Sequence, residues 1–467
     1  MQGKRYNQSR LVQEINIEML VPQNYILRHI DRAIDLSFIR ERTKKLYSEG
    51  LGRQSIPPEL VLRLFLLQYL FDLSDRALQG EVAMHAGFRW FCRLNFDDPI
   101  PDRTTLVKLR RLWSITGVFA SVMEQVVTQC VEAGLVSGKA IGVDGTQVTA
   151  NAATNSLVPL APVISVNDWV KRKQAADAEA EARKEPPTDP DKGGPGGATP
   201  AEADRPASSE REAGNPDFHG EKFSNATHRS KTDPDARLAR KGKAQEAKLR
   251  YFVHNSVDLR SGVILSTLAT QATGNAERLA ALAMLDDYLK WLPSVYGRRY
   301  LVADGGYTAG WYLAEVLRRG IYPMVPMATT TLEPIPTWQR QTNNMDQLRK
   351  RHEAVAEAMA RNTVRELQGP GTARRMQRAR TRVEHTFAEA KGCHGLGRAR
   401  GRGLLAVHTQ ALLTAIVQNV KRLAAWRRRS TPKTGVAPLV SSLQPLFGLV
   451  SAFKRGFLCR TINICQV

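Results

Sequence analysis

The sequence predicts an α/β protein whose central sheet is preceded by an all-helical block and followed by further helices. Apolar residues recur at three- and four-residue intervals in the first 135 residues, which is the period of an amphipathic helix. Runs rich in β-branched and apolar residues start near residue 139 and return at residue 249. A long polar segment lies between them, so the predicted sheet is interrupted by an insertion.

Two segments carry the prediction of the helical block. Residues 57–80, PPELVLRLFLLQYLFDLSDRALQG, show helical periodicity behind a proline pair that suits a helix start. Asp102 offers an N-cap for a second helix, and Lys108 and Arg110 lie mostly off its apolar face. Three leucines form that face: Leu106, Leu109 and Leu112. The block resembles a small DNA-binding module, and an ordinary amphipathic helix with a solvated basic side explains the pattern equally well.

The first strand is predicted within residues 139–150, KAIGVDGTQVTA, and should end at Asp144 because Gly145 follows as a turn residue. Residues 167–248 then become rich in Ala, Glu, Lys, Pro and Gly. This stretch contains too few large apolar residues to fold, so we predict a disordered insertion.

Alternating strands and helices are predicted after the insertion. Residues 298–307, RRYLVADGGY, are a buried strand that again ends in an acid followed by glycine, at Asp304. Residues 373–392 form a basic helix that carries Glu384. The remaining predicted elements are strands at 249–258, 262–271 and 322–327, and helices at 275–292, 308–320 and 404–426.

Three strands followed by alternating helix and strand is the ribonuclease-H-like order. In that order the first and fourth strands lie side by side at the sheet centre, and its last helix, here the one with Glu384, packs across them. The predicted domains are a helical DNA-binding domain at 1–135, two parts of the core at 136–166 and 249–426, the low-complexity insertion at 167–248, and a C-terminal tail at 427–467.

The charge balance favours polyanionic partners. The chain has 67 Lys and Arg against 45 Asp and Glu, a formal net charge of +22, and basic side chains neutralise phosphates. The five cysteines form no CxxC pair, which argues against a zinc knuckle or a disulfide framework. The N-terminus lacks the apolar stretch of a secretory signal, and no run is long enough to span a membrane. We therefore expect a cytoplasmic protein.

Asp144, Asp304 and Glu384 suggest a two-metal site, because carboxylates hold the hard, oxygen-seeking ion Mg²⁺. Each acid alone has an ordinary explanation. An aspartate before glycine is usually a turn residue, and Glu384 can pair with Arg380 four residues earlier on the same helix. Their joint occurrence in this element order favours metal-dependent phosphodiester chemistry.

The chain resembles bacterial insertion-sequence transposases of the DDE type, in the IS-eleven-eighty-two branch related to the IS-four and IS-five groups. The resemblance extends from about residue 10 to 426 and is carried by PDRTTLVKLR, VDGTQVTANA, TDPDAR, VADGGY and VEHTFAEAKG. It implies that Asp144, Asp304 and Glu384 are the catalytic and metal-binding triad, with Mg²⁺ as cofactor and Mn²⁺ as a substitute. It also implies association with the bacterial nucleoid.

These families share a signature around the glutamate: Tyr, two residues, Arg, three residues, Glu, six residues, Lys. Arg380 and Lys391 stand at the right spacing around Glu384, and Gln377 replaces the tyrosine. The resemblance gives the Arg and Lys phosphate contacts, whereas no tyrosine role can be transferred.

A DNA-binding surface is predicted where the basic residues gather. Residues 371–430 contain fourteen Lys and Arg against only Glu384 and Glu389. The predicted DNA-binding residues are Arg380, Lys391, Arg382, Arg398, Arg400, Lys108 and Arg110. Asp233 and Asp235 of TDPDAR are either a polar turn or a motif that touches DNA or orders the exit of the insertion.

The hypothesis is a transposase that cuts double-stranded DNA at its inverted-repeat ends and joins them to target DNA. It would work as a homodimer or a larger synaptic assembly and would not bind a membrane. Two alternatives remain open. One is an inactive or repurposed DNA-binding protein derived from a transposase, and the other is a metal-dependent nuclease that cuts without joining.

Overall fold

The computed structural model describes residues 16–47, 55–160, 174, 223–240, 246–292, 297–367 and 370–430. Most of the predicted insertion, and the predicted tail beyond Ser430, lie outside these residues. The described residues up to Arg428 belong to one compact unit.

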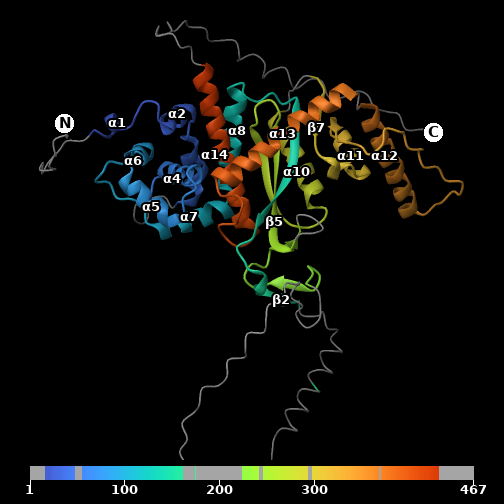
Figure 1. Ribbon diagram of the computed structural model, residues 1–467, viewed down its shortest axis with the longest axis horizontal. Helices are drawn as coiled ribbons and strands as arrows, with labels where there is room; N and C mark the ends of the chain where they lie inside the picture. Colours follow the sequence, from blue (N-terminus) through green and yellow to red (C-terminus); the bar gives the residue numbers. More distant parts are fainter. Residues whose placement is uncertain are drawn as a thin grey trace, which may run out of the picture. The chain divides into compact units, whose positions relative to one another are not determined.

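Short helices occupy the N-terminal part of the chain, coloured blue in Figure 1. Their bounds are α1 (Ile17–Leu20), α2 (Ile26–Ala33), α3 (Phe38–Thr43), the 3₁₀ turn η1 (Lys44–Leu46), α4 (Pro58–Leu70), α5 (Asp75–Met84), α6 (Ala86–Cys92), α7 (Arg103–Ile115) and α8 (Val118–Glu132). The predicted helix over 57–80 is thus two helices, and they are separated at Asp72, whose φ is 54°. Such a backbone conformation cannot continue a helix.

The helix α7 begins where the sequence predicts, but its buried face differs from the prediction. The Asp102 side chain accepts a hydrogen bond from the Thr104 N–H at 2.7 Å. Leu106 is buried, whereas Leu112 is 37% exposed and Trp113 is fully buried. Trp113 contacts Phe65 edge-on, so the large aromatic ring takes the core position that we predicted for Leu112.

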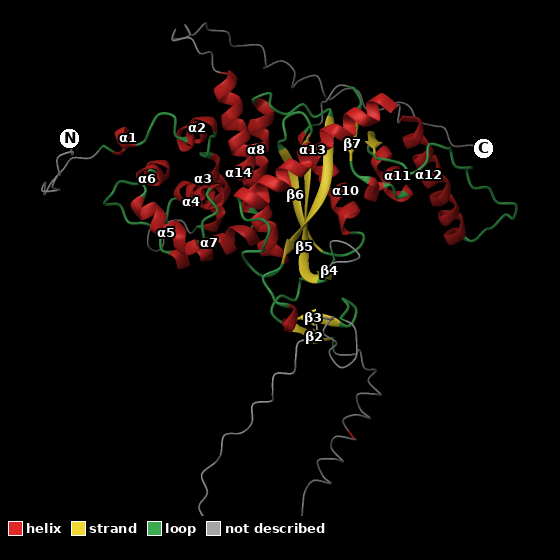
Figure 2. Cartoon of the chain, in the orientation of Figure 1, coloured by secondary structure: helices red, strands yellow, loops and turns green. Residues whose placement is uncertain are grey.

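A six-stranded sheet forms the centre of the fold, in yellow in Figure 2. Its strands are β1 (Ala140–Thr149), β4 (Arg237–Ala239), β5 (Lys248–Asp258), β6 (Ile264–Gln271), β7 (Arg299–Val302) and β8 (Ile321–Met324). The order is β4-β5-β1-β7-β8, and β6 also pairs with β5. β1 and β7 are parallel neighbours, as are β7 and β8, whereas β5 is antiparallel to both β1 and β6. These pairings confirm the predicted strand order, with the first and fourth core strands side by side.

The first core strand is longer than predicted. β1 does not end at Asp144, because β5 pairs with it continuously from Ile141 to Thr149, and this hydrogen-bond ladder carries the strand past Gly145. Gly145 is therefore not a turn residue. A Cβ atom at this position would lie only 2.8 Å from Nδ1 of His254 on β5, so the glycine leaves room for the histidine ring.

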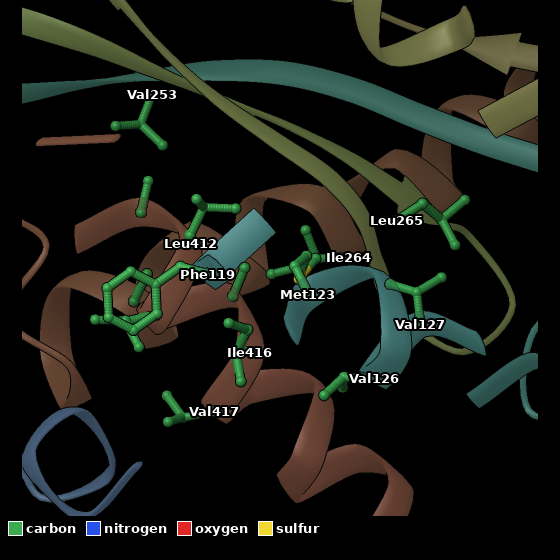
Figure 3. Close-up of a cluster of buried hydrophobic side chains, with 14 of the residues drawn as sticks. Phe119, Met123, Val126, Val127, Val253, Ile264, Leu265, Leu412, Ile416 and Val417 are labelled. Atoms are coloured by element: carbon green, nitrogen blue, oxygen red, sulfur yellow. The ribbon is translucent and has the colours of Figure 1, made fainter. Parts of the chain in front are cut away.

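Helices cover the sheet. They are α10 (Ala276–Trp291), α11 (Gly310–Arg318), α12 (Met345–Leu367), α13 (Pro370–Cys393) and α14 (Leu404–Ser430), and the 3₁₀ turn η3 (Gly305–Tyr307) follows β7. Figure 3 shows side chains of α8 and α14 packed together with Val253 of β5 and Ile264 and Leu265 of β6. The last N-terminal helix and the last helix thus share one apolar core with the sheet.

Two segments differ from the sequence prediction. Residues 223–240, predicted to be disordered, contain β4 and the strand β3 (His228–Ser230), which pairs with β2 (Leu157–Pro159) just after the turn η2 (Thr154–Ser156). The sequence predicted no element between the strand at 322–327 and the basic helix at 373–392, but this connection contains the 23-residue helix α12. None of the described helices is long and apolar enough to cross a lipid bilayer.

Candidate active site

Asp144 and Asp304 stand at the same level of two neighbouring parallel strands. The last residue pair of β1 and β7 is Gly142 with Val302. Each aspartate lies two positions beyond its member of that pair, so both carboxylates stand where β7 has just ended. Asp304 begins η3, and its Oδ1 accepts a hydrogen bond from the Gly306 N–H at 2.8 Å. The sheet therefore brings together two acids that are far apart in the sequence.

The helix α13 carries Glu384 to the same region. It contacts β1, β5, β7 and β8, as predicted for the helix that packs across the sheet. Val383 is fully buried beneath it, and a Cβ atom at Gly142 would lie 2.4 Å from Val383 Cγ2. Because Gly142 has no side chain, α13 packs directly against the backbone of β1 at this position. Glu384, the next residue, keeps 50% of its side chain exposed.

Arg380 joins two of the acids. Its Nη1 lies 3.1 Å from Asp144 Oδ2, and its Nη2 lies 2.6 Å from Glu384 Oε1. The sequence offered an ion pair within the helix and a shared catalytic site as separate explanations for Glu384. Both are compatible with the structure, because the same guanidinium reaches across to β1.

The electrostatics of the acids suit a cation. Burial raises the pKa of Asp144 above its ordinary value, and the negative charges of Asp304 and Glu384 raise it further. The Gly145 N–H and Arg380 act in the opposite direction. Carboxylate oxygens that repel one another are the donor set that Mg²⁺ prefers. As their side chains stand, no three His, Cys, Asp or Glu of the described residues form a finished metal site.

A fourth acid, Glu277, was missed by the sequence analysis. It lies in the first turn of α10, and its Oε1 is 3.4 Å from where a Cβ atom of Gly145 would stand. Burial raises its pKa, and the charges of Asp304 and Asp144 raise it further. Acids are common in the first turn of a helix because their charge interacts favourably with the helix dipole. The sequence alone therefore gave no indication that Glu277 lies at the site.

Gln377, which replaces the signature tyrosine, binds the sheet. Its Nε2 donates to the carbonyl oxygens of Ala303 and Met324, at 3.2 and 2.9 Å. Ala303 directly precedes Asp304, and Met324 ends β8. Because Gln377 lies seven residues before Glu384 on α13, it fixes the helix that carries the glutamate to the strand end that carries the aspartate.

Replacing Gln377 with leucine should therefore lower the turnover number for DNA cleavage by about 10- to 100-fold, the range found for groups that orient metal ligands. The apparent KM for DNA should hardly change, because the side chain binds only the protein's own backbone. Initial rates at several DNA concentrations measure both constants. The matched control is Gln347→Leu on the exposed surface of α12. A variant with wild-type turnover would show that α13 is held by its other contacts.

Apart from Arg380, which pairs with Asp144 and Glu384, the predicted DNA-binding residues separate into two groups. Arg382, Lys391, Arg398 and Lys108 are exposed. Arg110 and Arg400 line a cleft of about 820 Å³ between α4, α5, α7 and the segment before α14. The Arg110 guanidinium pairs with Asp75, and that of Arg400 pairs with Asp72 and lies over the Tyr69 ring, with 4.6 Å to the ring centroid.

The TDPDAR motif holds the start of α14. Asp233 is buried, and its Oδ1 accepts hydrogen bonds from the Tyr251 hydroxyl at 2.6 Å and the Gly403 N–H at 3.1 Å. Asp235 Oδ2 accepts one from the Leu404 N–H at 3.0 Å. Of the roles left open by the sequence, this geometry favours one in ordering the chain where it leaves the insertion.

Comparison with protein families gives two matches. Residues 15–112 match a transposase domain (DUF772), and residues 224–420 match the transposase DDE domain. The second match contains Asp304 and Glu384, whereas Asp144 lies between the two matches. No solved structure matches the chain. The assignment of Asp144 to the site therefore depends on its position in β1, beside Asp304 and Arg380.

Proposed function

We propose that this chain, a DDE transposase by its two domains, cuts DNA at the ends of an insertion sequence and joins them to target DNA. One observation carries the proposal: Asp144 and Asp304 stand at one level of adjacent parallel strands, and Glu384 reaches Asp144 through Arg380. The IS-eleven-eighty-two branch fits the motifs best. We expect the protein to act in the bacterial cytoplasm on the nucleoid.

In the proposed mechanism, Asp144, Asp304 and Glu384 would hold Mg²⁺, or Mn²⁺ in its place. When bound, the cation would neutralise charge at phosphorus and activate the attacking water or 3′-hydroxyl. The protein's own contribution is placement: the parallel pairing of β1 and β7 fixes the two aspartates, and the Gln377 contacts of α13 fix the glutamate. Arg380 stands between two of the carboxylates, where it can also contact a DNA phosphate.

DNA would be gripped by the exposed basic residues of α13 and by the N-terminal helices. Arg382, Lys391 and Arg398 lie exposed on or just after the helix that carries Glu384, so a duplex bound there would pass close to the acids. Transposition joins two DNA ends, and we therefore propose a homodimer or a larger synaptic assembly.

Purified protein, Mg²⁺ and labelled DNA carrying the element's inverted repeats test the proposal. The expected products are a nicked end with a 3′-hydroxyl and a slower species in which that end is joined to target DNA. Both should disappear with a chelator. Cleavage without joining would instead favour a metal-dependent nuclease. Binding without cleavage would favour an inactive or repurposed DNA-binding protein.

Lys108 and Arg110 should respond differently to replacement by alanine. Lys108 is exposed, so its loss should weaken binding to every DNA sequence and reduce the slope of log affinity against log salt by about 1. Arg110 bonds Asp75 and Gln68 and lies over the Phe65 ring, so its loss should mainly lower the Tm. Fluorescence anisotropy at several salt concentrations and thermal melting separate the two effects. An unchanged salt slope for Lys108→Ala would exclude a phosphate contact.

A further inference from the structure

The start of α10 is tied to both aspartates. Glu277 Oε1 is 3.4 Å from the position of a Cβ atom on Gly145, the residue after Asp144. The next residue, Arg278, donates from Nε to the Gly306 carbonyl oxygen at 2.9 Å, two residues after Asp304. Neighbouring residues of one helical turn thus lie beside both acid-bearing segments.

Glu277 approaches β1 from the face opposite to α13. Side chains of a strand alternate between faces, and Gly142 faces Val383 of α13 whereas Gly145 faces Glu277. β7 pairs with β1 only as far as Gly142. Past Gly142, no strand of the described residues pairs with β1 on the side of β7. At the level of Asp144, the two faces of the sheet are therefore not separated on that side. Carboxylates from both faces can therefore meet at the end of β7.

The Glu277 carboxylate has no hydrogen bond or ion pair within the described part of the chain, although it is partly buried. The guanidinium of Arg278 binds Gly306 and Asn275 instead. The charge of Arg278 lowers the pKa of Glu277, but burial and the two aspartates outweigh it. Burying a carboxylate without a hydrogen bond or ion pair next to two others is unfavourable, and proteins offset this with a proton or a cation.

His254 supplies an independent observation. The residue is fully buried, its Nε2 lies 2.8 Å from Thr270 Oγ1, and its Nδ1 has no hydrogen-bond partner. That Nδ1 is 2.8 Å from the same Cβ position on Gly145 that Glu277 faces. Burial lowers the pKa of His254 to about 4, so the ring is neutral at pH 7. A neutral, unpartnered ring nitrogen suits a water molecule in the shell of Mg²⁺, which keeps several waters when bound.

We propose that Glu277 is a fourth carboxylate of the cation site and holds a divalent ion together with Asp144 and Asp304. This rests on the proposed function, because it places the ion at the same strand ends. The Nδ1 atom of His254 lies beside Gly145 on the same face of β1 as Glu277 and would accept a hydrogen bond from a water of the ion's shell. Glu384 then approaches from α13 and Glu277 from α10, so two helices contribute acids from opposite faces of β1.

Calorimetric titration of the full-length protein with Mn²⁺ and with Mg²⁺, without DNA, tests the proposal. Glu277→Gln should weaken cation binding by at least about 10-fold. Its Tm in chelator should equal or exceed that of the wild type, because a repelling charge is removed. The Tm increase that Mn²⁺ causes in the wild type should shrink in parallel. Glu353→Gln, an exposed glutamate of α12, should behave as the wild type.

The variant Glu277→Asp distinguishes a direct role as a metal ligand from a purely electrostatic role. It keeps the charge but shortens the side chain, so it should bind Mn²⁺ more weakly than the wild type, whereas a purely electrostatic role would be preserved. Equal cation affinity of Glu277→Gln and the wild type would overturn the role of Glu277 and leave the proposed function intact. A wild-type protein that binds no cation and cuts no DNA would overturn both.

Discussion

Replacing Asp144 with asparagine is expected to reduce strand cleavage by at least about 100-fold, because even groups that only orient a metal ligand account for losses of that size. Asparagine has nearly the same shape and can still accept the hydrogen bond that Gly145 donates to Asp144 Oδ1 at 2.8 Å. Binding of the inverted-repeat ends should persist, because the exposed basic residues are untouched. Cleavage of labelled DNA and anisotropy with uncut DNA measure the two properties.

The same variant should change how stability depends on pH. Burial raises the pKa of Asp144, so the folded protein holds this proton more tightly than the unfolded chain. The tighter binding of this proton adds to the free energy of unfolding at a pH below the ordinary carboxyl pKa. This contribution is lost as the pH rises through the raised pKa of Asp144 in the folded protein. In chelator, the Tm difference between Asp144→Asn and the wild type should therefore grow in favour of the variant as the pH rises from about 4 towards 7. Asp346→Asn on the exposed α12 controls for a general charge effect. Wild-type cleavage by Asp144→Asn would remove Asp144 from the site.

Much of the site follows from the order of elements in the sequence. The order of elements predicted that the strands of Asp144 and Asp304 lie side by side, and their pairing at Gly142 and Val302 confirms it. The basic helix predicted at 373–392 is α13, and the order of elements predicted its place across the sheet. These features could be predicted because periodicity and connection rules restrict an α/β sheet to few arrangements.

Other features depend on contacts that have no local pattern. Gly145 was interpreted as a turn residue. A glycine is present there because the ring of His254, on a different strand, leaves no room for a side chain. The helix α12 was missed because its buried residues, Ala358, Ala360 and Val364, are few and mostly small, so the segment has the composition of a polar connection. Residues 223–240 contain few large apolar side chains. They are ordered by polar contacts such as that of Asp233 with Tyr251, which a composition argument cannot detect.

Replacing Gly142 with alanine is expected to have the second large effect, on both stability and catalysis. The added methyl group would lie 2.4 Å from Val383 Cγ2 and 2.7 Å from Leu259 Cδ2, closer than carbon atoms approach in proteins. Both neighbours are buried, so α13 or the β5–β6 turn must shift. Overpacking of this kind costs about 1–3 kcal/mol in the free energy of unfolding. Urea denaturation measures the loss.

The catalytic effect of Gly142→Ala should exceed what the stability loss explains. Val383 directly precedes Glu384, so a helix displaced from β1 carries the glutamate away from Asp144 and Asp304, and a misplacement of about 1 Å can cost about 100-fold in rate. Cleavage should therefore fall at temperatures where the variant is fully folded. The matched control is Gly392→Ala on the same helix, where an added Cβ atom meets nothing within 4 Å. Alanine there should stabilise the protein by about 0.4–1 kcal/mol and leave cleavage unchanged. If Gly142→Ala cuts DNA as fast as Gly392→Ala, then the close contact of α13 with β1 does not set the position of Glu384.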